Sequence, residues 1–401
     1  MAWISLGKLV LFVSGLLYLG SRWLHNCDDH ELQSVRSVRV ILLILAAFAV
    51  SLIWSGAAPG NALLAFVKHS KLLEIALLIS LIRNSRETRT ALLAFLTGQA
   101  ILIASSWAMA AGIPVPWATS QWATLPEMKT VVFSTYLDQS LIFCASAAVF
   151  WHLRHYWSTT SWLAGSLALA ALINTLFLQE GRTGYLAALT VITLAVMWEL
   201  PRKLRLVAVV LTPIMVLASV YVGSTKMQER IDQAVHESKN YSARDATSSS
   251  SGFRLNAWRR SVQAIMQSPI NGHGVGSWTL SVKKIEGADA AKVFGERLNS
   301  NPHQEYLLWG VELGIGGIVL LLLLIASLAR DAMAFEAPVK RATLSVVAVM
   351  AVACLFNSSL YDALIGDFFC ITLGLLMALG IRGGSSDRDK AMARQTAKNS
   401  A

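Results

Sequence analysis

The chain has 401 residues, of which 55% are hydrophobic and only 14% are charged. Soluble domains carry about 25% charged residues, so this composition argues against a soluble globular protein and favours a membrane protein. The net charge of +10 raises the possibility of nucleic-acid binding, but the basic residues are confined to alternate loops, which argues against that class. The four cysteines, Cys27, Cys144, Cys354 and Cys370, show no CxxC spacing, so neither a disulfide framework nor a zinc site is predicted.

Apolar runs of about 20 residues, long enough to cross a hydrocarbon core, recur along nearly the whole chain. They predict an all-α, polytopic transmembrane helical bundle of about 11–12 spans. The expected spans lie near residues 3–20, 38–57, 62–82, 90–112, 137–153, 158–179, 184–200, 204–223, 304–329, 341–360 and 361–381. In the first run, Lys8 is the only early charge and no small-residue cleavage site follows, so we expect a retained span rather than a signal peptide.

The spans divide the chain into four parts. Eight spans occupy residues 1–223, a long loop occupies 224–303, three more spans occupy 304–381, and a basic tail occupies 382–401. Lys and Arg gather in alternate loops and in the tail, whereas the opposite short loops hold only Lys129 and Arg182. Because the cytoplasmic side carries the Lys/Arg excess, we expect the tail inside the cell and the long loop outside the cytoplasm. A missed or additional span would reverse only the N-terminal end.

Span three, NALLAFVKHSKLLEIALLISLI, contains several ionisable residues: Lys68, His69, Lys71 and Glu74. Ionisable groups within a span are costly and are therefore candidates for function. Lys68 and Lys71 can reach a lipid phosphate from the outer side. Alternatively, Lys71 and Glu74, three residues apart, can form a structural pair.

The segment QEGRTGYLAAL, residues 179–189, places Arg182 just before span seven, on the side where arginine is otherwise rare. A guanidinium group presents a planar fork that matches phosphate oxygens and keeps its charge. The alternative is an interfacial arginine that extends to lipid headgroups. Asp138 and Gln139 open span five on the same face and are weaker candidates.

The loop over 224–303 is the longest connection, and long loops often carry function. Within it, GFRLNAWRRSVQAIM predicts an amphipathic helix that begins near Arg254 and lies on the membrane or docks on the bundle. Its expected apolar face consists of Leu255, Trp258, Val262, Ile265 and Met266.

A glycine-rich stretch, SPINGHGVGSW, follows this helix at residues 268–278. Gly272, Gly274 and Gly276 allow the backbone to approach a ligand closely, and consecutive N–H groups can cradle an anion. A plain flexible turn is the alternative interpretation. His273 lies in the same stretch and is expected to be a loop residue.

The stretch NPHQEYL opens span nine. Asn301, Pro302, His303 and Gln304 are predicted as N-cap, N1, N2 and N3 of a helix. The positive end of a helix disfavours imidazolium, so His303 in the first turn would suit a general base. A plain interfacial histidine is the alternative. Glu305 is the competing base, and it also fits a solvated first-turn acid.

Taken together, these segments resemble the bacterial O-antigen ligase family and its wider ligase/polymerase superfamily. RTGY at 182–185, FRLNAW with Arg254, GHGVGSW, and HQEYLLWGVELGIGG at 303–317 occur in the family's order. The resemblance implies a membrane-embedded glycosyltransferase at the periplasmic face of the bacterial inner membrane. Such an enzyme moves a polysaccharide from undecaprenyl diphosphate to a sugar hydroxyl of lipid A-core without a metal or other cofactor.

The resemblance also implies residue roles. Arginines equivalent to Arg182 and Arg254 engage the diphosphate, and the histidine matching His303 activates the acceptor. Further substrate contacts are expected from Lys68, Lys71, Gln139, Gly274, Glu305 and Tyr306. The expected partners are undecaprenyl-diphosphate-linked O-antigen, lipid A-core and membrane lipids, without nucleic acid. Gln304 and His273 depart from common family residues, which leaves the acceptor contacts open.

Three other functions compete with this one. An O-antigen polymerase uses the same donor but a lipid-linked repeat unit as acceptor, and sequence alone does not separate the two. A transporter of lipids or small anions is disfavoured because no internal repeat is detectable. A purely structural membrane protein leaves the polar clusters of the outer face without a role.

Overall fold

The computed structural model describes residues 9–15, 17–18, 21, 35–125, 128–156, 161–223, 228, 250–287 and 301–399. All regular structure in these ranges is helical, which confirms the all-α prediction. Six helical segments are long and apolar enough to cross a membrane: Arg36–Trp54, Ser85–Ala110, Ser161–Leu178, Ile315–Ala332, Ala337–Phe356 and Ala363–Gly383. The protein is therefore a multi-pass membrane protein. Of the first expected span, 3–20, the structure describes residues 9–15 and 17–18, and these are helical.

The described elements are all helical segments. In chain order they are α3 (Arg36–Ser51), η1 (Leu52–Trp54), α4 (Pro59–His69), η2 (Ser70–Leu72), α5 (Leu73–Leu81), α6 (Ser85–Ala110), η3 (Gln121–Thr124), α7 (Tyr136–Leu153), α8 (Ser161–Ile173), η6 (Asn174–Leu178), α9 (Arg182–Glu199), η7 (Arg202–Leu204), α10 (Arg205–Gly223), α12 (Ser250–Gln267), α13 (Trp278–Glu286), α15 (Glu305–Leu313), α16 (Ile315–Ala332), α17 (Ala337–Phe356) and α18 (Ala363–Asn399).

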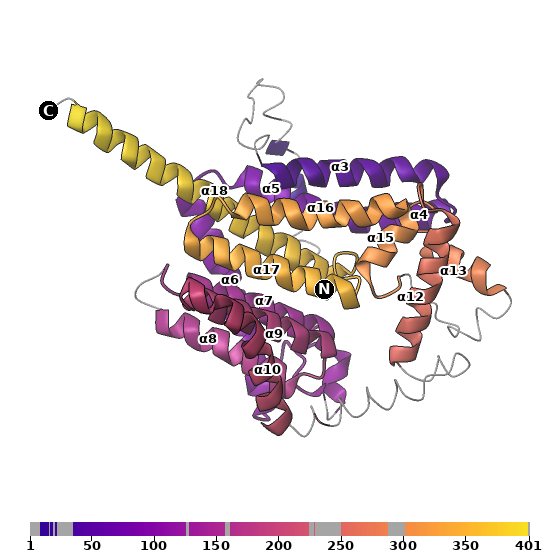
Figure 1. Ribbon diagram of the computed structural model, residues 1–401, viewed down its shortest axis with the longest axis horizontal. Coiled ribbons are helices and arrows are strands. Elements are labelled where there is room, and N and C mark those ends of the chain that lie inside the picture. Colours follow the sequence, from indigo (N-terminus) through magenta and orange to yellow (C-terminus); the bar gives the residue numbers. More distant parts are fainter. Residues whose placement is uncertain are drawn as a thin grey trace.

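The long helices form two neighbouring groups (Figure 1). α3, α5, α16, α17 and α18 make one group, and α7 to α10 make the other, with α17 packed against α7 and α9. α12 runs crosswise over one end of the first group, next to α15. This end of the bundle, called the α12 end below, carries the loops that position the candidate site.

Two of the expected spans are interrupted. Span three consists of α4, the 3₁₀ turn η2 and α5. The expected single span 304–329 is wrong, because Gly314 (φ 67°) separates α15 from α16. The amide of Ile315 donates to the carbonyl of Pro269 (2.8 Å), and a Cβ at Gly314 would lie 2.4 Å from that oxygen. The segment that follows α12 therefore packs against the break between α15 and α16, and its Pro269 carbonyl accepts the hydrogen bond from the first amide of α16.

The amphipathic helix is confirmed as α12. Of its expected apolar face, Ile265 is buried and Trp258 is half-buried, whereas the other three side chains are exposed. Leu255, Val262 and Met266 are 47%, 45% and 74% exposed. The buried side consists mostly of small or polar residues, Asn256, Ala257, Ser261, Ala264 and Ile265. Small side chains allow α12 to approach α13 and α15 closely, and the indole of the buried Trp278 on α13 donates to Ser261 Oγ (2.8 Å). Close packing and this hydrogen bond hold this side of α12 against its neighbours.

The glycine-rich stretch packs against the turn between α3 and α4. At Gly274 the backbone has φ 85°, and a Cβ would lie 2.3 Å from the Cα of Ser55. The amide of Gly56 donates to the carbonyl of His273 (3.1 Å), and Ser55 Oγ donates to that of Val275 (2.7 Å). Backbone meets backbone here, so only glycine fits at position 274.

We predict that Gly274→Ala destabilises the protein strongly, because the new methyl group meets backbone atoms that cannot yield and the required φ is unfavourable for alanine. The apparent melting temperature in detergent should fall by several degrees. Gly60→Ala is the matched control, since a Cβ at Gly60 near the start of α4 meets nothing within 4 Å. Equal melting temperatures for the two variants would contradict this assignment.

Candidate functional site

The structure brings Arg182, Arg254 and His303 together at the α12 end. Arg182 is the first residue of α9, Arg254 lies in the first turns of α12, and His303 lies in the loop before α15. Burial lowers the pKa of Arg254, and the positive charge of Arg182 lowers it further. Burial likewise lowers the pKa of His303, and the positive charge of Arg254 adds to this effect. Arg182 therefore lies close enough to Arg254, and Arg254 close enough to His303, for each positive charge to lower the pKa of its neighbour.

His303 has an unusual backbone. Its φ of 52° makes it the only residue other than glycine with positive φ in the described parts of the chain. Its amide donates to Asn301 Oδ1 (2.9 Å), which closes a turn across Pro302. Strained backbone of this kind is found preferentially at functional sites, where the surroundings hold it in place.

The predicted helix-cap register is therefore wrong. α15 begins at Glu305, and Gln304 is its N-cap, whose side chain accepts from the amide of Leu307. Asn301 uses its side-chain oxygen on the turn that holds His303, so it does not cap the helix. His303 precedes α15, and a low pKa at this position comes from burial and from Arg254 instead of from the helix N-terminus.

A second loop, residues 357–362 between α17 and α18, lies against His303. Asn357 Oδ1 is 3.2 Å from His303 Nδ1, and Ser358 Oγ accepts from the amide of Gln304 (3.2 Å). Asn301 Nδ2 donates to Asp362 Oδ1 (3.2 Å). Burial raises the pKa of Asp362 to about 6, with a further contribution from the negative charge of Asp138. An acidic pair thus accompanies the cationic residues, and sequence analysis missed the contribution of Asn357.

The lysines of the interrupted span approach this second loop. Lys71 Nζ is buried and donates to the carbonyls of Tyr361 (3.2 Å) and Asp362 (2.7 Å). Lys68 Nζ lies 4.2 Å from the ring centroid of Tyr361, a cation–π contact. Both positive charges lower the pKa of Asp362 and so partly offset its burial. The lysines therefore support the loop that contacts His303.

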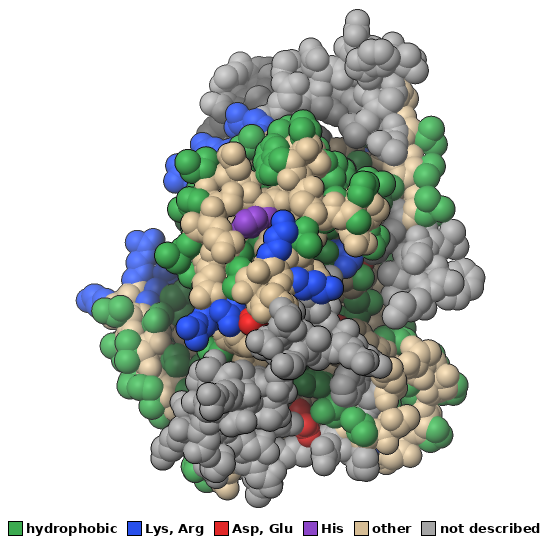
Figure 2. Space-filling view, turned by 90° about the vertical axis from the view of Figure 1, so that its right-hand side faces the viewer, with side chains coloured by type: hydrophobic (Ala, Val, Ile, Leu, Met, Phe, Trp, Pro, Cys, Tyr) green, Lys and Arg blue, Asp and Glu red, His purple; other side chains and the backbone are tan. Residues whose placement is uncertain are grey.

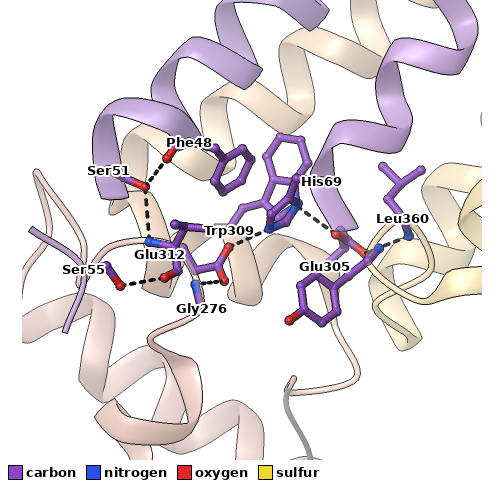
Figure 3. Close-up of polar contacts among 11 residues, drawn as sticks. Phe48, Ser51, Ser55, His69, Gly276, Glu305, Trp309, Glu312 and Leu360 are labelled. Carbon is purple, nitrogen blue, oxygen red and sulfur yellow. Dashed lines mark hydrogen bonds and ion pairs between the residues drawn. The ribbon is translucent and has the colours of Figure 1, made fainter. Parts of the chain in front are cut away.

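Glu305 is enclosed by the protein. It is 0% exposed, and its carboxylate accepts from Trp309 Nε1 (2.8 Å) and from the amides of Leu360 (2.9 Å) and Tyr361 (3.2 Å). Figure 3 shows its side chain directed at Leu360. The expectation of a solvated first-turn acid is wrong. Because both oxygens are engaged, His303 is the better placed of the two candidate bases.

Three other expected substrate contacts also have partners within the protein. Gln139 is 3% exposed and accepts from the amide of Val132 (2.8 Å), which braces the segment before α7. The hydroxyl of the half-buried Tyr306 lies 3.4 Å from the carbonyl of Ala351. Gly274 donates its N–H to the carbonyl of Glu312 (2.9 Å). Gln139, Gly274 and Tyr306 therefore shape the surroundings of the cluster.

A buried ion pair that sequence analysis missed joins α4 to α15 (Figure 3). His69 Nε2 lies 2.9 Å from Glu312 Oε2, and Glu312 Oε1 accepts from the amide of Gly276 (2.7 Å). The imidazole of His69 stacks on Phe48, with ring centroids 3.9 Å apart. His69 and Glu312 are 2% and 0% exposed. The pair therefore fixes the glycine-rich stretch to both helices.

This ion pair changes the interpretation of the glycine-rich stretch. The amides of residues 272, 273, 274, 275 and 276 donate in turn to Ser268 O, Val311 O, Glu312 O, Ser51 Oγ and Glu312 Oε1. Of these five amides only that of Gly276 binds an anion, and that anion is the protein's own Glu312 carboxylate. The expectation of an anion cradle for a ligand is therefore corrected: the glycines provide close packing.

Residues 167–322 match the family model described as O-antigen ligase. The matched segment contains Arg182, Arg254 and His303, and it ends before Asn357 and Asp362. The matched segment is therefore similar to the O-antigen ligase/polymerase family. No curated protein matches the chain.

The face of the protein that carries the candidate site is basic. Figure 2 views the molecule from the α12 end and shows Lys and Arg side chains gathered near the middle, with Asp and Glu only in small patches. Arg259 on α12 and Lys283 and Lys284 on α13 are exposed. Within the described residues, no group of three or more His, Cys, Asp or Glu side chains is placed to hold a metal ion.

We predict that Glu312→Ala destabilises the fold by roughly 3–5 kcal/mol, because it leaves His69 and the Gly276 amide buried without their partner. The apparent melting temperature should drop accordingly. Glu199→Ala makes the same chemical change in the more exposed pair with Arg154, where roughly 0–1 kcal/mol is expected. If both variants melted like the parent, the ion pair would not hold the α12 end together.

Proposed function

We propose that the protein is an O-antigen ligase. In this proposal it transfers polysaccharide from undecaprenyl diphosphate to a sugar hydroxyl of lipid A-core at the periplasmic face of the bacterial inner membrane. The observation that carries the proposal is the convergence of Arg182, Arg254 and His303 at one end of a membrane bundle, within the segment that matches the family. Both substrates carry lipid tails, and a site at the end of the bundle can receive them from the leaflet.

The two arginines suit a diphosphate leaving group. As the anomeric carbon–oxygen bond breaks, the leaving oxygen takes the electron pair and the diphosphate gains negative charge. Guanidinium groups fixed in advance at that point stabilise the transition state without reorganising. Arg182 and Arg254 lie close enough to affect each other, and arginine stays protonated even so. A bound diphosphate would relieve the repulsion between them.

His303 suits the role of general base. The acceptor hydroxyl must lose its proton as its oxygen forms the new bond to the anomeric carbon, and a neutral imidazole can take that proton. Attack opposite to the leaving diphosphate inverts the anomeric configuration. The configuration of the linkage before and after transfer tests this scheme, and retention would exclude a single displacement.

An O-antigen polymerase is the alternative function, because the same cluster would serve the same donor. Reconstitution in liposomes with lipid-linked glycan and lipid A-core separates the two. Label that moves to lipid A-core supports the ligase, whereas glycan that lengthens on its lipid carrier supports the polymerase.

We predict that His303→Ala lowers the rate of transfer by about 10²–10⁴-fold, the usual contribution of a general base. Arg254→Ala should lower it by at least about 10²-fold, as for other losses of charge stabilisation. Arg259→Ala, on the same helix but exposed, and His155→Ala, an exposed histidine elsewhere in the chain, are matched controls that should keep parental rates. A parental rate of transfer by His303→Ala would contradict the proposal.

The pH dependence follows from the lowered pKa of His303. The base works only when neutral, so activity is lost as pH falls through its pKa. Since this pKa lies below the usual 6.5, the acid limb of the kcat/KM profile should lie below pH 6.5. Arg254→Lys keeps a positive charge near the imidazole, so its residual activity should show the same acid limb. A parental limb above pH 7 would contradict His303 as the group that titrates.

A further inference from the structure

Two asparagines hold His303 from opposite ends of the residue. Asn301 Oδ1 accepts from the backbone amide of His303 (2.9 Å), and Asn357 Oδ1 faces the ring atom Nδ1 (3.2 Å). Both asparagines are nearly buried, at 6% and 5% exposure. A buried polar side chain without its hydrogen-bond partner is costly, so these contacts have a defined geometry.

Asn357 is itself firmly placed. It is the C-cap of α17, with extended backbone (φ −152°, ψ 157°), and its amide donates to the carbonyl of Ala353 (2.8 Å). The next residue, Ser358, accepts from the amide of Gln304 through its hydroxyl. The loops that contain Asn357 and His303 are therefore joined at two successive positions, one through the imidazole and one through the backbone.

We propose that Asn357 is a positioning residue that fixes the tautomer and the orientation of the His303 ring. The amide oxygen of Asn357 accepts the proton on Nδ1, which leaves the lone pair on Nε2 as the atom that takes the proton of the acceptor hydroxyl. This inference rests on the proposed function and adds to it the residue that sets the active nitrogen.

The surroundings of the ring support this assignment. The charged group from α12 that acts on His303 is Arg254, and the ring of Phe253 on the same helix lies 6.3 Å from the imidazole, edge to face. From the loop after α17, Asp362 approaches through Asn301. The positive charge of Arg254 disfavours imidazolium, whereas the hydrogen bond to Asn357 favours it. Asn357 therefore orients the imidazole ring and partly offsets the lowering of the pKa of His303.

The test compares Asn357→Asp, Asn357→Ala and the parent in the reconstituted transfer assay across pH. Asn357→Asp keeps the shape but places a carboxylate at Nδ1, which raises the pKa of His303. The acid limb of kcat/KM should therefore move up by roughly one pH unit or more. Asn357→Ala should lower kcat by roughly 10–100-fold while the KM for the lipid-linked donor stays within about twofold. Asn271→Asp, the same change at an exposed position, is the matched control.

The outcomes separate this inference from the proposed function. An Asn357→Asp profile that overlays the parental one, with full kcat, overturns the positioning role even if His303→Ala is inactive. Full transfer by His303→Ala overturns the proposed function itself. If Asn357→Ala fails to elute as the parent does in size exclusion, Asn357→Asp decides alone, because its side chain has the same shape. A purely structural asparagine would alter yield and stability but would leave the acid limb in place.

Discussion

Two buried carboxylates on α15 organise the whole α12 end. Glu305 and Glu312 lie seven residues apart, so they project from nearly the same side of a short helix. Each is 0% exposed and is held by N–H groups from segments far away in the chain. An unpaired buried charge would be very costly, so folding must bring those segments to α15. The interactions of α15 are therefore the constraint on which the positions of the surrounding loops depend.

The positions of the site residues follow from this constraint. Glu305 binds the amides of Leu360 and Tyr361, and this holds the loop after α17 next to the start of α15. His303 immediately precedes that start, so it meets Asn357 in the same loop. Glu312 holds the chain that follows α12, so α12 lies across the end of the bundle and carries Arg254 toward His303. The residues proposed to face the substrate are thus positioned by the buried carboxylates of α15.

The sequence predicted the helices and drew attention to Arg182, Arg254 and His303, because both kinds of signal are local. Apolar runs indicate the helices, and an arginine or histidine at the edge of an apolar run is recognisable as a candidate functional residue. It did not predict partners separated by long stretches of chain, such as His69 with Glu312 or His303 with Asn357. The cap register before α15 failed because Asn301 has two competing uses for its side chain, and only the tertiary structure shows that the turn prevails. The small and polar side by which α12 packs was not predicted, because small residues at a close helix contact look unremarkable in a hydrophobicity pattern.

The site itself works against stability. Arg182 and Arg254 are held near each other, Arg254 is held near an imidazole, and His303 has a left-handed backbone. Each arrangement raises the free energy of the folded protein before any substrate binds. Such a cluster persists only where other interactions in the surrounding structure compensate for its cost in free energy. The buried contacts of α15 supply that stabilisation. In the proposed function, the charge repulsion prepares the site for a diphosphate, and the enclosed carboxylates keep the repelling groups in place.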